Sequence, residues 1–300
     1  MTCYARLKAW RSFSERTATG KPAIVFTRPA GPAEPIELPC GQCIGCRLDK
    51  SREWALRCVH EASLYDVNSF VTLTYDQEHM PDGGTLVKKD HQDFMKRLRS
   101  RFPVRKIRYF LCGEYGSELS RPHYHALLFN LEFPDQEYWC ESNGNKVYRS
   151  PELEELWPFG YSWIGTVTWE SAAYVARYCM KKVNGDRAWE RYCRDVDVET
   201  GECKVLEPEY VAMSRRPGIG REWYSAYKRD CRKGFVSHEG KVFPLPKYYD
   251  GIMEVENVEL ALDLKRRRRE AAAKNAVSPK RLQTLRRVKE LQTNRLKRSI

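Results

Sequence analysis

The sequence lacks the features of a membrane or secreted protein. None of its 300 residues belongs to an apolar run of 18 or more, and the first ten contain no continuous apolar segment. This argues against a membrane span and against a secretory signal. The 11 cysteines are an odd number, so free or metal-bound thiols in a reducing cytoplasm are expected rather than a disulfide framework.

Motifs for nucleotide hydrolysis are also missing. Neither a Walker P-loop nor a GxGxxG motif occurs, so no built-in helicase motor is expected. The segment 214–224 (SRRPGIGREWY) combines two arginines with a glycine turn that could bring backbone amides near a phosphate. A structural loop is the favoured interpretation of this segment.

Positive charge is present in excess but is unevenly spread. The net charge is +12, and residues 261–300 alone carry 14 Lys or Arg against 3 Asp or Glu. The rest of the chain is therefore almost neutral. A near-neutral body with a basic tail is typical of a nucleic-acid partner. The tail is either a solvated charged end or a DNA contact that acts by counterion release.

Hydrophobic periodicity predicts strands and helices in alternation. Strands are predicted at 69–75, 106–113, 122–129 and 161–169, and helices at 47–65, 88–101 and 170–182. Residues 134–158 look like an insertion, and the proline-rich stretch 1–39 is expected to be irregular. Hairpin-connected strands with interleaved helices predict an α+β fold with a central antiparallel sheet and flanking helices.

Two histidines on one predicted strand form the first candidate site. His123 and His125 flank Tyr124, and alternate side chains of a strand share a face. Glu114 ends the preceding strand of the predicted hairpin and could complete a two-imidazole, one-carboxylate metal site with open positions for water and a phosphate oxygen. The competing interpretation is two unrelated histidines and a solvated turn carboxylate.

Two tyrosines on the predicted helix 170–182 form the second. Tyr174 and Tyr178 are four residues apart, so they are neighbours on one helix face. Arg177, Lys181 and Lys182 accompany them. A phenol with a pKa near 10 needs help to attack a phosphodiester, and a metal and a lysine can supply it. The competing interpretation is core packing of two tyrosines.

Three closely spaced cysteines form the third. Cys40, Cys43 and Cys46 could bind Zn²⁺ as thiolates. The candidates for a fourth ligand are Cys3, Cys58 and His60. An iron–sulfur cluster is a weaker alternative because the extended ferredoxin-like ligand run is missing, and buried thiols in a turn before a helix compete with both.

Three ordered segments resemble the motifs of the HUH endonucleases. They are SFVTLTYD (69–76), RPHYHALLF (121–129) and YVARYCMKK (174–182). The chain is more narrowly similar to the replication initiators of gokushovirus-like microviruses, which are small phages with single-stranded DNA genomes. That likeness covers roughly residues 1–230 and includes PCGQCIGCR (39–47), GEYG (113–116) and SRRPGIG (214–220).

The resemblance implies a fold and a chemistry. It implies an RRM- or ferredoxin-like core and rolling-circle replication, in which Mg²⁺ or Mn²⁺ on His123, His125 and a third ligand polarises the scissile phosphate. Tyr174 and Tyr178 match the paired nucleophiles that form a 5′-phosphotyrosine, with Lys182 assisting and Arg177 and Lys181 contacting DNA. Tyr124 departs from the aliphatic residue that is usual between the histidines.

The sequence predicts three regions and a set of partners. The regions are a cysteine-containing segment at 1–46, a nuclease domain at 47–235 and a basic extension at 236–300. The expected partners are a single-stranded DNA origin and the host polymerase and helicase, in the bacterial cytoplasm, with no membrane partner. The rival hypotheses are a non-catalytic DNA-binding or packaging protein, and a plasmid relaxase or transposase of the same superfamily.

Overall fold

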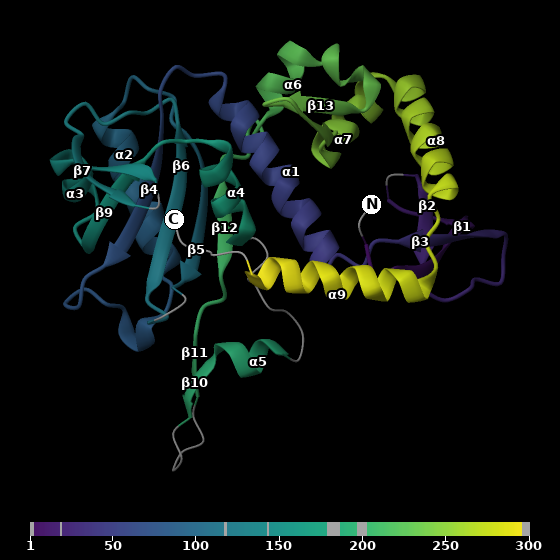
Figure 1. Cartoon of the computed structure of the whole chain (residues 1–300), viewed down its shortest axis with the longest axis horizontal. Helices are drawn as coiled ribbons and strands as arrows, with labels where there is room; N and C mark the ends of the chain where they lie inside the picture. Colours follow the sequence, from purple (N-terminus) through teal and green to yellow (C-terminus); the bar gives the residue numbers. More distant parts are fainter. Residues whose placement is uncertain are drawn as a thin grey trace. The chain divides into compact units, whose positions relative to one another are not determined.

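The computed structural model of the chain describes residues 3–18, 20–116, 119–142, 144–178, 187–196 and 203–295. Backbone contacts divide the chain into two compact units. The smaller unit joins Met1–Lys50 to Arg266–Arg298, and the larger unit consists of Ser51–Lys265 with the last two residues. The division falls inside helices α1 (Ile44–Ala62) and α8 (Val258–Lys274) (Figure 1).

A seven-stranded antiparallel sheet forms the centre of the larger unit. Its strand order is β12-β5-β6-β4-β9-β8-β7 (Figure 1). The strands are β4 (Asn68–Tyr75), β5 (Arg108–Tyr115), β6 (Pro122–Phe129), β7 (Glu137–Ser142), β8 (Asn145–Arg149), β9 (Gly160–Gly165) and β12 (Tyr210–Met213). With helices flanking the sheet, the predicted α+β class is confirmed.

The two faces of this sheet belong to separate hydrophobic cores, because successive side chains point to opposite faces. On β6, Tyr124 and Leu128 pack in the core that includes α2 (Lys88–Arg101) and α3 (Pro151–Leu156). Leu127 packs in the core that includes α1 and α4 (Trp169–Tyr178). The same alternation places His123 and His125 on the face that α4 covers.

The predicted elements of the larger unit are confirmed, with small shifts at their ends. The helix at 88–101 and the strand at 122–129 have the predicted bounds. The strand predicted at 161–169 ends at Gly165, and the helix after it begins at Trp169. Hydrogen bonds between Thr168 and Ser171 explain that early start, since they satisfy backbone groups at the helix N-terminus. The insertion at 134–158 contains β7, β8 and α3.

The remaining elements of the larger unit are short. They are η1 (Asp82–Gly84), α5 (Arg187–Tyr192), β10 (Cys193–Val196), β11 (Cys203–Val205), α6 (Arg221–Tyr227), η2 (Asp230–Lys233), β13 (Phe235–His238), β14 (Lys241–Pro244) and α7 (Lys247–Glu256). Tyr249 and Met253 of α7 and Leu264 of α8 form a third core with Leu56 of α1. Residues 236–265, which the sequence assigned to a C-terminal extension, therefore pack within the larger unit.

The smaller unit contains a three-stranded antiparallel sheet of order β2-β1-β3. Its strands are β1 (Leu7–Arg16), β2 (Pro22–Val25) and β3 (Ala33–Leu38). The expectation of irregular structure over 1–39 was therefore wrong. Pro22 and Pro35 lie on the two edge strands, where a missing N–H interrupts no inner ladder, so prolines there do not exclude a sheet.

The basic tail is helical in its described part. It contains the end of α8 and the whole of α9 (Pro279–Arg295), and α9 buries no side chain. No helix among the described residues is both long and apolar enough to span a bilayer.

Candidate active site

Strands β5 and β6 bring the three predicted metal ligands to one face of the sheet. Glu114 is the register partner of His123 across the hairpin, and His125 lies two residues further along β6. The rings of His123 and His125 are nearly parallel, at 9°, with their centroids 6.3 Å apart. The sequence prediction that these three side chains share a face thus agrees with the strand register.

His125 is held from both sides by polar side chains. Its Nε2 lies 3.1 Å from Glu114 Oε1, and its Nδ1 lies 3.0 Å from the Thr72 hydroxyl on β4. Both His125 and Glu114 are buried. A hydroxyl can donate or accept, so Thr72 can bond Nδ1 whether the ring proton lies on Nδ1 or on Nε2. The threonine therefore orients the imidazole in both tautomers.

His123 has one ring nitrogen committed to the backbone. Its Nδ1–H donates to the Arg121 carbonyl oxygen at 2.6 Å, which directs the lone pair to Nε2. Burial lowers the pKa of His123 below its usual value, the hydrogen bond to Arg121 opposes this effect, and the charge of His125 reinforces it. The neutral imidazole that a metal ligand requires is thereby favoured.

These side chains fit a divalent ion. Two ligand atoms about 2.1 Å from one ion and at right angles lie about 3 Å apart, close to the separation of His125 Nε2 and Glu114 Oε1. An ion there would replace the proton between them. Metal-bound histidines usually donate their other ring N–H to a carbonyl or another oxygen, and Arg121 and Thr72 supply such oxygens.

Tyr174 of α4 packs directly against this site. Its ring meets His125 edge-on, with centroids 5.0 Å apart at 86°, and lies 6.3 Å from the Phe70 ring. The Arg177 guanidinium lies 5.7 Å from the Tyr174 ring centroid. Buried Ala172, Val175 and Ala176 hold α4 on the sheet. The helix thus places one predicted nucleophile beside one predicted ligand.

Three other predicted residues cannot be placed in the same way. Tyr178 is the last residue of α4, but its side chain lies outside the described part of the chain. Lys181 and Lys182 also lie outside the described residues. Their assignments as nucleophile, DNA contact and catalytic lysine stay predictions.

Comparison with known proteins identifies relatives among phage proteins. The family described as "Replication-associated protein ORF2" matches residues 68–183. The chain is 35% identical to the replication-associated protein ORF2 of Spiroplasma virus 4 over 255 residues, 80% of this chain and 75% of that protein. The chain belongs to the family of phage replication-associated proteins. The resemblance to microvirus initiators is thereby confirmed.

Two further members of the family are longer than the matched part of this chain. The replication-associated protein VP4 of Bdellovibrio phage phiMH2K is 35% identical over 221 residues, 70% of this chain and 65% of that protein. The ORF4 protein of Chlamydia phage 1 is 36% identical over 226 residues, 72% of this chain and 53% of that protein. No solved structure matches the chain.

The matched range of the replication-associated family contains the whole histidine site. Residues 68–183 begin at β4, which carries Thr72, and include α4, which carries Tyr174. The β1–β3 sheet and α9 lie outside it. The family profile and the site geometry therefore coincide on the same part of the sheet.

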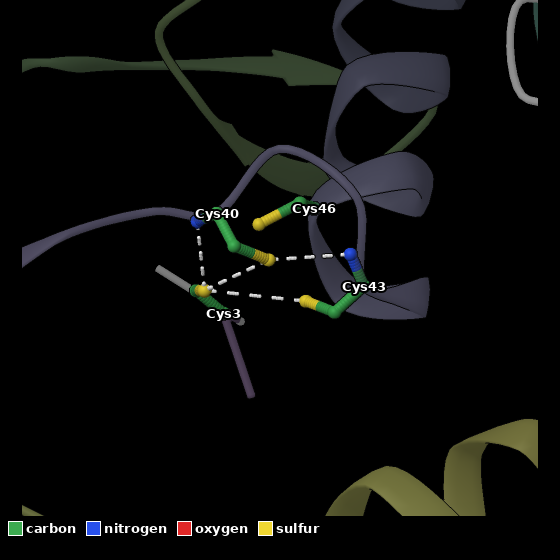
Figure 2. A group of neighbouring side chains, drawn as sticks. All are labelled: Cys3, Cys40, Cys43 and Cys46. Atoms are coloured by element: carbon green, nitrogen blue, oxygen red, sulfur yellow. Dashed lines mark hydrogen bonds between the residues drawn. The ribbon is translucent and has the colours of Figure 1, made fainter. Parts of the chain in front are cut away.

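The cysteines of the replication-associated chain gather at a second place, in the smaller unit. The sulfurs of four of them lie within 4.8 Å of one another (Figure 2). They are Cys3, Cys40, Cys43 and Cys46, here called the four-cysteine cluster. The other two candidates for a fourth ligand lie in the cores of the larger unit: Cys58 packs beneath the sheet, and His60 Nδ1 bonds the Tyr249 hydroxyl.

The SRRPGIG segment forms a braced loop. The Ile219 carbonyl accepts from Arg57 Nε at 3.1 Å, and the Gly220 N–H donates to Glu61 at 2.6 Å. Glu61 in turn pairs with buried Arg108. These bonds support the expected structural role, and at Gly220, with φ of 77°, a Cβ would lie 2.2 Å from the Tyr249 hydroxyl.

Sequence reasoning missed the residues that surround the histidines. Thr72 was read only as part of a strand. Tyr161 and Trp163 of β9 are the register partners of Thr74 and Thr72, and their rings stack at 16° with centroids 6.4 Å apart. By alternation they lie on the histidine face, and Tyr161 is 56% exposed. The alternating aromatics of Tyr161-Ser162-Trp163 were the available signal.

Proposed function

We propose that this replication-associated protein initiates rolling-circle replication by nicking and rejoining single-stranded DNA at an origin. The observation that carries the proposal is the contact of Tyr174 with His125, whose Nε2 meets Glu114. A nucleophile beside a two-histidine, one-carboxylate site is the arrangement that metal-assisted phosphodiester transfer needs. The family membership and the basic tail support the same role.

The residues divide the chemistry among themselves. His123, His125 and Glu114 would hold Mg²⁺ or Mn²⁺, which when bound polarises a phosphate oxygen and stabilises negative charge. The Tyr174 phenol gives up its proton and its oxygen attacks the phosphorus. The bond from phosphorus to the 3′ oxygen breaks, and that oxygen takes a proton to become a free 3′-OH. The 5′ phosphate remains on the tyrosine.

The strand-transfer half of the proposal needs a second nucleophile. Tyr178 follows Tyr174 by four residues on α4, so it is the candidate that would attack the junction regenerated after one round of synthesis. Arg177, Lys181 and Lys182 would contact the DNA or stabilise the reacting phosphate. Host polymerase would extend the 3′-OH in the bacterial cytoplasm, with a host helicase separating the strands.

The DNA track can be proposed from the same face. Stacked Tyr161 and Trp163 lie one strand away from the histidine strand, with β4 between. Exposed aromatic rings are the surfaces on which unpaired bases stack without regard to sequence. Single-stranded DNA that crosses β9 would bring its phosphates toward His123 and His125.

A covalent-adduct assay tests the proposal. Full-length protein is mixed with a labelled origin oligonucleotide and Mn²⁺, and products are separated in denaturing detergent. We expect a protein–DNA band and a shorter free strand, both abolished by chelation. Tyr161→Phe serves as a control that keeps both tyrosines of α4. Metal-dependent binding without any adduct would favour the non-catalytic alternative and contradict the proposal.

A further inference from the structure

The four-cysteine cluster draws on distant parts of the smaller unit. Cys3 precedes β1, Cys40 and Cys43 lie in the loop after β3, and Cys46 is in the first turn of α1. Figure 2 shows the four sulfurs turned toward a common point between these segments. Two of them are buried and two are half-buried. Residues some 40 positions apart thus present four soft donors to one small volume.

The spacing of the sulfurs matches a single tetrahedral ion. With Zn–S bonds of about 2.3 Å, tetrahedral geometry sets sulfurs about 3.8 Å apart. Cys3 Sγ lies 3.7 Å from Cys40 Sγ and 4.0 Å from Cys43 Sγ. A disulfide would need about 2.05 Å. An iron–sulfur cluster, with several irons and sulfides between its cysteines, would need a wider opening.

Backbone N–H groups already point at the sulfurs. The Cys40 N–H donates to Cys3 Sγ at 3.3 Å, the Cys43 N–H donates to Cys40 Sγ at 3.3 Å, and the Tyr4 N–H donates to Cys43 Sγ at 3.4 Å. Such bonds stabilise thiolates and orient them as ligands. The positive N-terminal end of α1, which has no acidic residue in its first turn, further offsets the negative charge of four thiolates around a divalent ion.

The smaller unit has little else to hold it together. Among its described residues, the buried hydrophobic side chains are Cys3, Ala9 and Cys43, whereas Phe13 and Phe26 are half or more exposed. No side chain of α9 is buried. Units with so small a core usually depend on disulfides or a structural metal.

We propose that the four-cysteine cluster binds one Zn²⁺ as a closed structural site that stabilises the β1–β3 sheet and the start of α1. All four positions are filled by protein sulfurs, so no position is left for water or substrate. The site is therefore separate in place, ligand type and role from the histidine site of the proposed nuclease.

Metal analysis of untagged full-length protein tests this proposal. The His123→Ala/His125→Ala variant is used as the background, so that zinc adsorbed at the histidine site is not counted. We expect about one zinc per chain, and after exchange to Co²⁺ an intense near-ultraviolet band from thiolate-to-cobalt charge transfer. Cys40→Ser should lose the metal and the band, whereas Cys140→Ser, half-buried and outside the cluster, should keep both.

The outcomes are distinct and require no DNA. Folded background protein with no bound metal and freely reactive cluster thiols would overturn the proposal, as would iron with labile sulfide, or zinc retained by folded Cys40→Ser. If Cys40→Ser does not fold, the metal content and cobalt spectrum of the background protein decide alone. The result is independent of whether the chain nicks DNA.

Discussion

The histidine site and the four-cysteine cluster differ in almost every property that governs metal chemistry. The first presents two imidazoles and a carboxylate on a rigid sheet, with a tyrosine ring against His125. The second presents four equivalent sulfurs that enclose one point. Hard, mixed ligands with open positions suit an ion that must also touch a phosphate, whereas four thiolates suit an ion that only holds the chain.

The two places also differ in what supports them. Cores on both faces of the seven-stranded sheet fix the histidine strand, so loss of metal there should cost activity and little stability. The smaller unit has almost no core, so loss of metal there should cost stability and little chemistry. Each prediction below is a way to break or sharpen this contrast.

The largest expected effect comes from exchanging the damage between the two places. His125→Ala should slow cleavage of a short saturating oligonucleotide by about 10³-fold, because metal stabilisation of the transition state contributes several kcal/mol, while the melting temperature changes little. Cys40→Ser should leave this rate little changed but make the smaller unit sensitive to proteolysis. Cleavage rates and limited proteolysis measure the two effects.

Exposed His79, which pairs with Asp76 outside both sites, supplies the matched control as His79→Ala. Wild-type cleavage by His125→Ala would remove the histidine site from the mechanism. A folded Cys40→Ser protein as inactive as His125→Ala would erase the contrast between the two places.

A subtler change tests how the histidine is oriented. Thr72→Val keeps the shape of the side chain and removes the partner of His125 Nδ1, so cleavage should fall about 10- to 100-fold with weaker activation by Mn²⁺. Thr74→Val, on the same face two residues along β4, is the control. Metal titrations of the cleavage rate give the measurement, and equal behaviour of the two variants would show that Thr72 is only structural.

A buried histidine outside both sites sharpens the contrast through pH. Burial lowers the pKa of His60 to about 3, so the folded state holds this ring neutral while the unfolded chain protonates it below about pH 6.5. Stability is therefore full above pH 6.5 and falls as pH drops, by about 2 kcal/mol at pH 5 from this residue alone.

Denaturant unfolding between pH 7 and 5 measures this dependence. His60→Gln should show a shallower fall than the wild type, although His91, whose pKa burial lowers to about 4, adds a similar contribution to both proteins. An identical pH dependence in the variant would show that His60 is not buried in its neutral form.

The smallest effect concerns charge that lies in neither site. Replacing Arg267, Arg268 and Arg269 of α8 by Gln should reduce the salt slope of single-stranded DNA binding by about 2, if each contacts one phosphate. Substitution is preferable to deletion of the tail, because Leu264 is buried in the third core. Arg101→Gln, ion-paired with Glu152, is the control, and an unchanged slope in the triple variant would make this basic segment a passive end.

Short-range patterns predicted most of the larger unit. Alternation along RPHYHALLF gives both the strand and the shared face of His123 and His125, and a hairpin brings Glu114 to their side without any long-range information. The helix that carries Tyr174 follows from its apolar spacing. These features depend on neighbours in sequence, which a single chain displays directly.

Features that depend on distant pairing could not be predicted. Cys3 was one of three candidates for the fourth ligand, and only the pairing of β1 with β3 brings it beside Cys40. Pro22 and Pro35 suggested irregular structure because edge and central strands cannot be distinguished before pairing is known. Thr72 gained its role only from its register with His125.

The identity of the nucleophile is the central claim, and mapping the covalent adduct tests it most directly. Wild type, Tyr174→Phe, Tyr178→Phe and the double variant are each incubated with the origin oligonucleotide and Mn²⁺, digested, and analysed by mass spectrometry of the peptide–DNA product. The account predicts adducts only on Tyr174 or Tyr178, reduced but present in the single variants and absent from the double variant. An adduct on any other residue, or one that persists in the double variant, would contradict it.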